Sequence, residues 1–347
     1  MRALSEFPAD TAAKVTTVFA DIDDTLTTDG RLPAVAYRAL EDLFNAGFHV
    51  APITGRPAGW CDLIARLWPV HGVVGENGAF YFAYDAKTRK MRREYFADAA
   101  ERARNSAHLA KIEARVLAEV PGCAISADQP YREADLAVDF SEDVTPLDTA
   151  AVTRIRDIFE EDGAIAKISS IHVNGWYGDY DKLSMSRRFA KEVLGFDLEA
   201  EKSRIIFCGD SPNDAPMFSY FPNSCGVANV ADFVDQITCK PAWITAKKGG
   251  EGFVELAQKL LTSQEDLRSC ADYSSSDEQP LENGQTLAQT GGLAPMRAHS
   301  CYPPVQKFVL PRIRLSTVPR ATWYGSRFIA CHSLRAPLHD QNRQLDD

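Results

Sequence analysis

Two short acidic segments, each directly after an apolar run, constrain the fold of this chain more than any other feature. Asp21-Ile22-Asp23-Asp24-Thr25 follows the apolar residues 15–20, and Gly209-Asp210-Ser211-Pro212-Asn213-Asp214 follows residues 204–208. This pattern predicts carboxylates at the carboxyl ends of buried parallel strands, where open α/β sheets place their active sites. Carboxylates crowded at one sheet edge repel each other, and ligand sets made only of oxygen favour Mg²⁺. The sequence therefore predicts a metal-assisted site on an α/β sheet.

The bulk composition is that of a soluble globular protein, with 45% hydrophobic and 25% charged residues. The net charge of −10 argues against nucleic acid as the main partner, because phosphate backbones favour a basic surface. The eight cysteines form no C-x-x-C pair, which is typical of reduced thiols. No apolar stretch has the length of a membrane span or a signal peptide. We expect a cytoplasmic protein without a membrane partner, and its oligomeric state stays open.

The order of predicted elements divides the chain into three parts. Alternating strands and helices over 1–78 predict a Rossmann-like, doubly wound parallel sheet, and the same alternation returns over 178–262. The intervening residues 79–177 indicate an inserted α+β domain. Residues 263–347 lack apolar periodicity and are rich in Ser, Pro, Gly and Gln, so we expect a disordered tail.

The pattern also predicts individual elements of the insertion and the core. The insertion begins with a predicted antiparallel hairpin, formed by 79–84 and 91–96. A long helix over about 98–119 comes next, and the insertion ends in a strand over 165–173. The last predicted helix of the core spans 251–262.

The acidic segments predict specific chemistry. Asp21, at a strand end beside a cation, is placed to attack phosphorus and form an aspartyl-phosphate. Asp23 is placed to protonate the leaving oxygen and then to deprotonate the hydrolytic water. Asp210 and Asp214 would complete the Mg²⁺ site. An alternative role for Asp214 is to contact the metal ligands instead of the ion itself.

A phosphoryl group also needs hydrogen-bond donors. Thr54 offers a hydroxyl and Gly55 a backbone amide, while Lys182 opens a predicted helix whose amino end suits an anion. Taken singly, a Thr-Gly-Arg segment is usually a turn, and a lysine at a helix start is usually a surface residue. Their order around two acidic strand ends favours phosphate binding, and we count Asn213 with these residues.

Together these motifs resemble those of the haloacid dehalogenase (HAD) superfamily. The matching positions are Asp21-x-Asp23-x-Thr25, Thr54, Lys182 and Gly209-Asp210-x-x-x-Asp214. Their spacing is similar to that of subfamily IIB, which includes Cof-type sugar-phosphate phosphatases and sucrose-phosphate phosphatase. The resemblance covers residues 15–262.

This resemblance implies a Rossmann-like core, a C2-type cap inserted after the third strand, and Mg²⁺-dependent hydrolysis of phosphomonoesters. It also implies that the main-chain carbonyl of Asp23 is a metal ligand. Asp24 stands where many members have glycine.

Substrate residues are expected near the predicted junctions of core and cap, namely Arg56, Asn77, His172, Asn174 and Trp176. The last three alternate in sequence, so they would share one face of a strand. Trp176 could stack on a sugar ring; alternatively it packs the hinge, and His172 is a structural histidine. We predict a small phosphorylated metabolite as substrate, with a sugar phosphate favoured.

Two other functions compete with this hypothesis. A sugar phosphomutase of the phosphomannomutase type would share the cap and the core motifs. It would also need a second phosphate site rich in arginine, for which Arg92, Arg93, Arg102 and Arg104 are the candidates. A non-catalytic phospho-ligand binder would not need both Asp21 and Asp23, so their joint presence counts against it.

Overall fold

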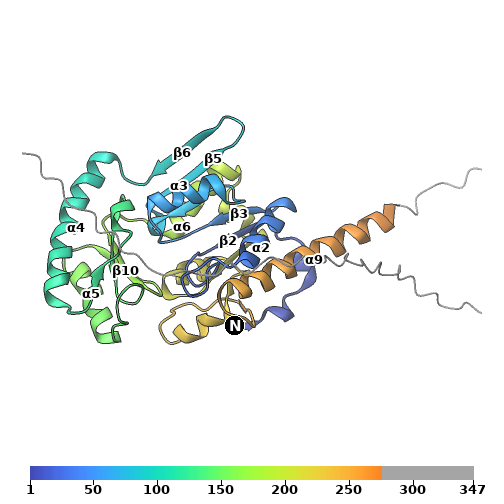
Figure 1. Ribbon diagram of the computed structural model, residues 1–347. Helices are drawn as coiled ribbons and strands as arrows, with labels where there is room; N and C mark the ends of the chain where they lie inside the picture. Colours follow the sequence, from blue (N-terminus) through green and yellow to red (C-terminus); the bar gives the residue numbers. More distant parts are fainter. Residues whose placement is uncertain (276–347) are drawn as a thin grey trace, which may run out of the picture. The chain divides into compact units, whose positions relative to one another are not determined.

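A six-stranded parallel sheet is the centre of the protein, whose computed structural model describes residues 1–275 (Figure 1). The strand order is β1-β13-β12-β11-β2-β3. The strands are β1 (Arg2–Ala3), β2 (Thr17–Ala20), β3 (His49–Pro52), β11 (Ile205–Gly209), β12 (Cys225–Gly226) and β13 (Trp243–Ile244). Strands β2 and β11 are neighbours, with Phe19 opposite Phe207. The predicted α/β class is therefore confirmed.

Helices cover both faces of this sheet because the central strands are apolar on both sides. Along β2, Val18 and Phe19 belong to different hydrophobic clusters, one on each face. One face carries α2 (Ala34–Asn45), α3 (Ala58–Leu67) and α9 (Gly249–Ser275). The opposite face carries α6 (Lys182–Phe189) and α8 (Ala215–Tyr220). The shorter helices are α1 (Ala9–Ala12) and α7 (Leu198–Glu201).

Helix α9 is longer than the predicted helix over 251–262, because the next residues still contact the core. Ser263 is buried, and the Gln264 amide donates a 3.0 Å hydrogen bond to the Val15 carbonyl. The predicted end at 262 is therefore wrong, and the helix reaches Ser275. The remainder of the predicted tail, 276–347, lies outside the described residues.

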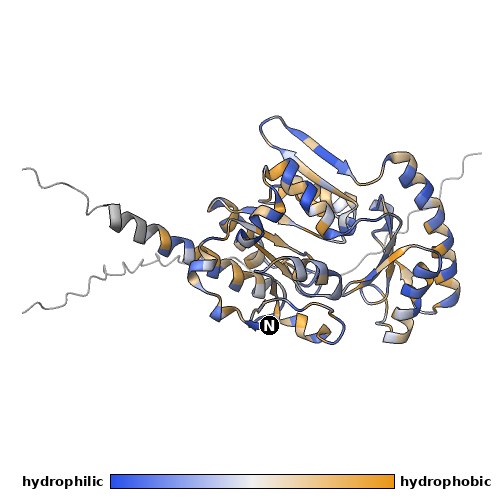
Figure 2. Ribbon diagram, turned by 180° about the vertical axis from the view of Figure 1, so that it is seen from behind, coloured by the Kyte–Doolittle hydropathy of each residue, from blue (hydrophilic) through white to orange (hydrophobic). Residues whose placement is uncertain are grey.

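The predicted hairpin forms, and it extends the core. Strand β4 (Val73–Gly75) pairs with β5 (Phe80–Asp85), and β5 pairs with β6 (Lys90–Tyr95), both antiparallel. A parallel bridge between Ile53 and Val74 joins this three-stranded sheet to the segment after β3. Figure 2 shows the hydrophilic outer strand β6 in blue, in keeping with its place at the sheet edge.

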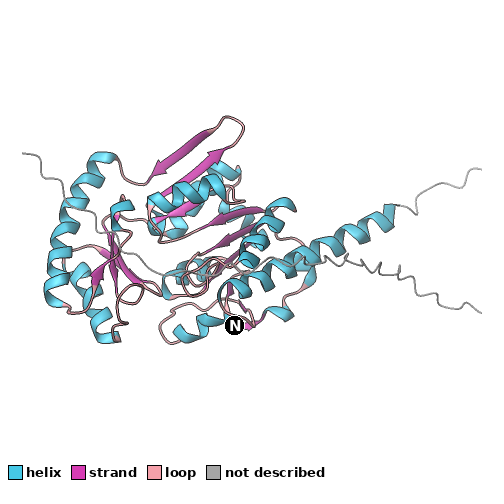
Figure 3. Ribbon diagram, in the orientation of Figure 1, coloured by secondary structure: helices cyan, strands magenta, loops and turns pink. Residues whose placement is uncertain are grey.

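The inserted domain is a four-stranded antiparallel sheet with two helices on it (Figure 3). The strand order is β7-β8-β10-β9. The elements are α4 (Ala99–Glu119), β7 (Ala124–Ile125), β8 (Asp135–Asp139), α5 (Thr149–Glu161), β9 (Ile165–Ile168) and β10 (His172–Trp176). The insertion has a hydrophobic core of its own, which includes Ile112, Val138 and Phe159. The predicted insertion, 79–177, also includes the hairpin; we use the word cap for residues 99–176, which form this sheet and its helices.

The single strand predicted over 165–173 is wrong, because a turn at 169–171 divides it into β9 and β10. The Ser169 hydroxyl accepts a 3.0 Å hydrogen bond from the His172 amide and donates one to the His172 carbonyl. Serine hydroxyls offer the backbone this alternative to ladder pairing, so two adjacent serines favour a turn. In the described part of the chain, no helix combines the length and apolarity that crossing a membrane requires.

Candidate active site

Three buried carboxylates converge at the carboxyl ends of β2 and β11. Asp21, Asp210 and Asp214 each offer an oxygen atom, and these atoms lie within 4.8 Å of one another. The parallel register of β2 and β11 brings Asp21 beside Asp210, because each follows directly on its strand. The convergence that the two acidic segments predict is therefore present.

Asp214 reaches back to the end of β11 through a 3-10 turn over Pro212–Asp214. Its carboxylate accepts hydrogen bonds from the backbone amides of Asp210, at 3.0 Å, and Ser211, at 3.4 Å. This position requires glycine at 209, because an added Cβ would lie 2.3 Å from Asp214 Oδ2. The glycine in this motif thus serves the placement of the second carboxylate.

Asp210 is fixed from two sides. The Thr25 hydroxyl donates a 3.1 Å hydrogen bond to Asp210 Oδ1, and the Asn229 amide donates one of 3.2 Å to Oδ2. The same amide donates to the Asp24 carbonyl at 3.0 Å. The sequence motif includes Thr25 but does not indicate that it binds Asp210, and no local pattern indicates Asn229.

Lys182 supplies a cation to this group. Its Nζ lies 2.8 Å from Asp214 Oδ1 and 3.1 Å from Asp21 Oδ1. Asp181 begins α6 as its N-cap, with a reciprocal capping box to Ser184. Gly78, at φ +110°, allows the start of this helix to approach, because an added Cβ would meet the Asp181 carbonyl oxygen at 2.0 Å.

The charges of this site leave an excess of negative charge. Burial raises the pKa of Asp21 to about 7; Lys182 lowers it and the neighbouring Asp214 raises it. Burial and the Asp214 charge also raise the pKa of Asp210 well above its ordinary value. The Lys182 ammonium faces the carboxylates of Asp21, Asp210 and Asp214, and the atoms that these acids offer to a cation are all oxygens. Such a donor set fits a hard divalent cation such as Mg²⁺.

The segment after β3 forms the next wall of the site. Thr54 is buried, and its hydroxyl accepts a 3.0 Å hydrogen bond from the Arg56 amide. Asn77 packs under Gly55, and its side-chain amide is buried with no partner among the described residues. Asn213 accepts a hydrogen bond from the Ser211 hydroxyl and faces the pocket beside Asp21.

Arg56 lies between Asp23 and the cap. Its Nε is 2.9 Å from both carboxylate oxygens of Asp23, and its Nη2 is 2.7 Å from Oδ1. The same Nη2 donates to Glu142 at 2.8 Å, and Nη1 donates to Asp128 at 3.4 Å. Both of these acids belong to the cap.

The cap residues predicted on one strand face separate into two groups. His172 and Asn174 line the small pocket beside Asp21. His172 Nε2 lies 2.9 Å from Glu142 Oε2, and Asn174 donates to Asp135 at 2.9 Å. Trp176 is instead buried in the core cluster, stacked on Tyr180 at 5.5 Å between ring centroids.

Four charged cap residues at this seam escaped sequence reasoning. The side chain of Arg132 is only 1% exposed, and it donates to the Gly55 carbonyl at 2.9 Å and to Asp135 at 3.0 Å. The full set is Asp128, Arg132, Asp135 and Glu142. Arg132 pairs locally with Asp128 and Asp135. The core partners of this set, Gly55 and Arg56, lie far away in sequence, so no local spacing could have indicated the seam.

The pocket between the acids and the cap is almost closed. Asp21, Asp23, Arg56, His172 and Asn174 surround about 10 Å³ of free space. A single water molecule needs about that much, so a phosphoryl group cannot enter this arrangement. The structure is therefore a closed state of cap and core.

The fold combines a parallel α/β sheet, acidic residues at the strand ends and an inserted cap. This is the fold of the HAD superfamily, which confirms the predicted resemblance at the level of fold. By sequence, the chain matches no protein-family model and no curated protein.

Several solved structures are similar to this chain. A protein from Thermoplasma acidophilum is similar at 18% identity and a TM-score of 0.55, over 71% of this chain and 98% of its own. A candidate HAD/COF-like hydrolase from Plasmodium vivax is 15% identical with a TM-score of 0.52, over 74% and 99%. The sucrose-phosphatase of Synechocystis reaches 14% identity and a TM-score of 0.49, over 70% and 97%.

Proposed function

We propose that the protein is a Mg²⁺-dependent phosphomonoester hydrolase acting on a small phosphorylated metabolite. The observation that carries this proposal is the convergence of three buried carboxylates and one lysine next to a fourth acid, Asp23. Like charges in a low-dielectric site destabilise the fold, so a buried cluster of this kind indicates a functional site.

In this proposal Asp21 attacks the phosphorus atom, and the bond from phosphorus to the leaving oxygen breaks. Asp23 gives its proton to that oxygen, and the alcohol departs. Asp23 then takes a proton from water as the water oxygen attacks the aspartyl-phosphate, which releases phosphate and restores the Asp21 carboxylate. Lys182 and Thr54 hold the phosphoryl oxygens, with the Gly55 amide.

The metal site would consist of the Asp21 and Asp210 carboxylates and the Asp23 carbonyl. When bound there, Mg²⁺ would neutralise charge on the phosphoryl group. The Asp214 carboxylate already accepts hydrogen bonds from two backbone amides and from Lys182, so we assign it the role of orienting the lysine.

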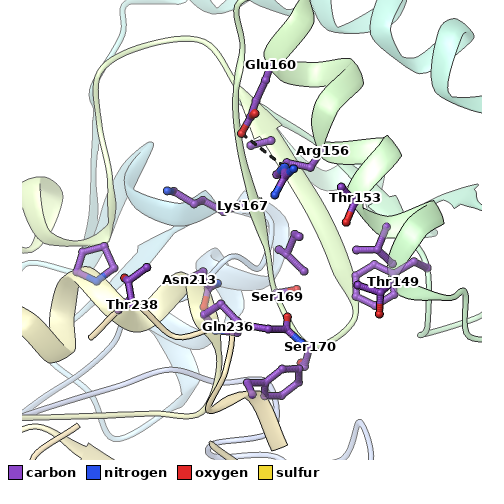
Figure 4. Close-up of a pocket in the computed structure, with 18 of the residues that line it drawn as sticks. Thr149, Thr153, Arg156, Glu160, Lys167, Ser169, Ser170, Asn213, Gln236 and Thr238 are labelled. Atoms are coloured by element: carbon purple, nitrogen blue, oxygen red, sulfur yellow. Dashed lines mark ion pairs between the residues drawn. The ribbon is translucent and has the colours of Figure 1, made fainter. Parts of the chain in front are cut away.

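A second cavity supports the proposal that the leaving group of the substrate carries several hydroxyls. This cleft of about 1020 Å³ lies between cap and core, and it adjoins the closed pocket at Ser169, Ser170 and Asn213. Figure 4 shows that hydroxyl and amide side chains line the cleft together with the charged residues Arg156, Glu160 and Lys167. The labelled hydroxyl and amide residues are Thr149, Thr153, Ser169, Ser170, Asn213, Gln236 and Thr238. Such groups suit the hydroxyls of a sugar.

The arginines considered for a mutase do not support a second phosphate site. Arg92 pairs with Glu192, and Arg93 pairs with Asp62. Arg102 lies 3.7 Å from Glu133 and over the Tyr95 ring. Neither the closed pocket nor the large cleft is lined by any of them. We therefore favour hydrolysis over phosphomutase activity.

The test is phosphate release from a panel of sugar phosphates, with Mg²⁺ and with EDTA. Asp21→Asn should abolish turnover, a loss of about 10⁴-fold or more, because no nucleophile remains. Asp85→Asn, at the exposed end of β5, is the matched control and should keep the rate. Release that persists in Asp21→Asn, or that EDTA leaves unchanged, would contradict the proposal.

A further inference from the structure

Arg56 joins the candidate acid/base to the cap through one guanidinium group. We propose that Arg56 is a positioning residue for Asp23, and that the cap carboxylates of Asp128 and Glu142 hold Arg56 in that position only when the cap is closed. This inference rests on the proposed function, because it assigns a role in the same reaction. It also differs from the sequence-based expectation that Arg56 contacts the substrate.

The contact between Arg56 and Asp23 fixes the carboxylate in orientation as well as in place. Nε lies at 2.9 Å from both oxygens and Nη2 at 2.7 Å from one of them. A planar guanidinium that forks onto a carboxylate allows little rotation. The Arg56 side chain is only 4% exposed, and its Cζ lies 4.3 Å from the centre of the Trp60 ring. Arg56 itself therefore has little freedom.

Two of the three acids around Arg56 come from the cap. Glu142 follows β8 and accepts from Nη2 at 2.8 Å, while its other oxygen lies 2.9 Å from His172. Asp128 lies 3.4 Å from Nη1 and is fixed by Ser126 at 2.7 Å and Arg132 at 2.8 Å. These partners are themselves held in place within the cap, so they can hold Arg56 only from the closed position.

The closed position must be temporary in a working enzyme. Only about 10 Å³ is free beside Asp21, so substrate enters when the cap moves away. Opening separates Arg56 from both cap acids and leaves Asp23 as its remaining carboxylate partner. Closing over substrate restores the contacts of Arg56 with Asp128 and Glu142. A protonated Asp23 then accepts from the guanidinium through one oxygen and presents its O–H to the leaving oxygen through the other. The acid/base is thus oriented at the moment when water is excluded from the pocket.

The kinetic test uses two leaving groups. p-Nitrophenolate departs without a proton, whereas a sugar alkoxide needs the proton of a well-placed acid. Arg56→Lys keeps a cation but loses the fork, and Glu142→Gln removes the charge of one cap partner. Glu161→Gln is the matched control, because Glu161 is exposed and, among residues 1–275, its ion-pair partners are the cap arginines Arg115 and Arg154.

We expect Arg56→Lys to lower kcat/KM for the best sugar phosphate of the panel about 100-fold, and that for p-nitrophenyl phosphate less than about tenfold. Glu142→Gln should show the same split at about tenfold against about twofold. Glu161→Gln should leave both substrates within about twofold of wild type. Equal losses for both substrates, or a rise in KM alone, would assign Arg56 to substrate binding and overturn the proposal.

A second experiment does not depend on activity. If closing the cap positions Asp23, then Asp23 must favour closure by the same factor, because coupling between two equilibria is reciprocal. Cysteine-independent spin labels at the exposed positions Arg38 in α2 and Lys111 in α4 report the distance between core and cap. Asp23→Ala and Glu142→Gln should shift the distances towards longer values, and Asp85→Ala should not.

The two experiments separate the inference from the function. A wild-type protein that releases no phosphate would refute the proposed hydrolase, while the label distances would still decide the coupling. A distance distribution for Asp23→Ala identical to that of wild type would overturn the inference. Circular dichroism of each variant identifies misfolding, and Glu142→Gln provides the answer if Arg56→Lys fails to fold.

Discussion

Among single residues, Asp24 differs from the motif of the HAD superfamily, and the backbone around the acids explains why this difference is tolerated. Asp24 occupies a position where many members have glycine, and its φ of 52° lies in the left-handed region. Glycine adopts this region freely, and Asp tolerates it better than most side chains. The Asp24 amide donates a 2.9 Å hydrogen bond to the Thr27 hydroxyl, which stabilises the turn. The substitution is therefore compatible with the motif.

Gly209 is a position where no such tolerance exists. Gly209→Ala should lower the phosphate-release rate at least about tenfold and cost about 1–3 kcal/mol of unfolding free energy, because the new methyl group displaces the Asp214 carboxylate. Steady-state rates and urea unfolding measure both effects. Gly30→Ala is the control: its backbone is left-handed, but nothing lies within 4 Å of the added Cβ. Loss of rate in both variants would contradict this explanation.

At the scale of elements, Glu76 connects the core to the cap. Its buried carboxylate accepts backbone hydrogen bonds from Ala58 at the start of α3 and from Glu133, Ala134 and Asp135 in the cap. The distances range from 2.6 Å to 3.2 Å. One side chain thus satisfies amides of two domains, at a φ of 42°. Sequence reasoning noted a change of rhythm at 75–78 but not this role.

Glu76→Gln should destabilise the protein by about 1–3 kcal/mol, because the new NH₂ group faces backbone donors and leaves some of them without an acceptor. Urea unfolding at neutral pH measures the loss. Glu133→Gln is the matched control, since that side chain is 44% exposed and its ion pair is long. Equal stability of Glu76→Gln and wild type would show that the amides find other partners.

The contact of Glu142 predicts a pH dependence. Burial raises the pKa of Glu142, but hydrogen bonds with His172 and Arg56 more than offset this, and the pKa falls to about 2. A lowered carboxylate pKa stabilises the fold above the unfolded value of about 4.5, and this contribution is lost as the pH falls towards 2.

Glu142→Gln should therefore be less stable than wild type by about 2 kcal/mol at pH 6, with the difference shrinking below about pH 4.5. Thermal unfolding at a series of pH values measures it, with Glu161→Gln as the exposed control. A difference that stays constant down to about pH 2 would contradict the ion pair as its cause.

At the scale of the whole molecule, the three acids at the sheet edge should link folding to the metal. About 5 mM Mg²⁺ should raise the free energy of unfolding by about 1–3 kcal/mol, because the cation binds only where β2 and β11 bring the carboxylates together. Urea unfolding with Mg²⁺ and with EDTA, at equal ionic strength, measures the effect. Asp210→Asn should lose most of it; an equal gain in that variant would place the binding elsewhere.

Local patterns along the chain were enough to predict most elements and the acids at the strand ends. Apolar runs and helical periodicity are short-range signals, and an acid that follows a buried strand can emerge only at that strand's end. Reasoning failed where a local exception decided the structure, as in the turn at 169–171 and the extension of α9 past 262.

The meeting of charges at the seam of core and cap, in contrast, depends on the folded arrangement. Arg56 finds Asp128 and Glu142 across 72 and 86 residues of chain, and Glu76 finds the Asp135 amide across 59. No periodicity reports such distances, because they follow from how the cap docks on the core. The physical reason is that hydrogen bonds depend on proximity in space, whereas patterns record only proximity along the chain.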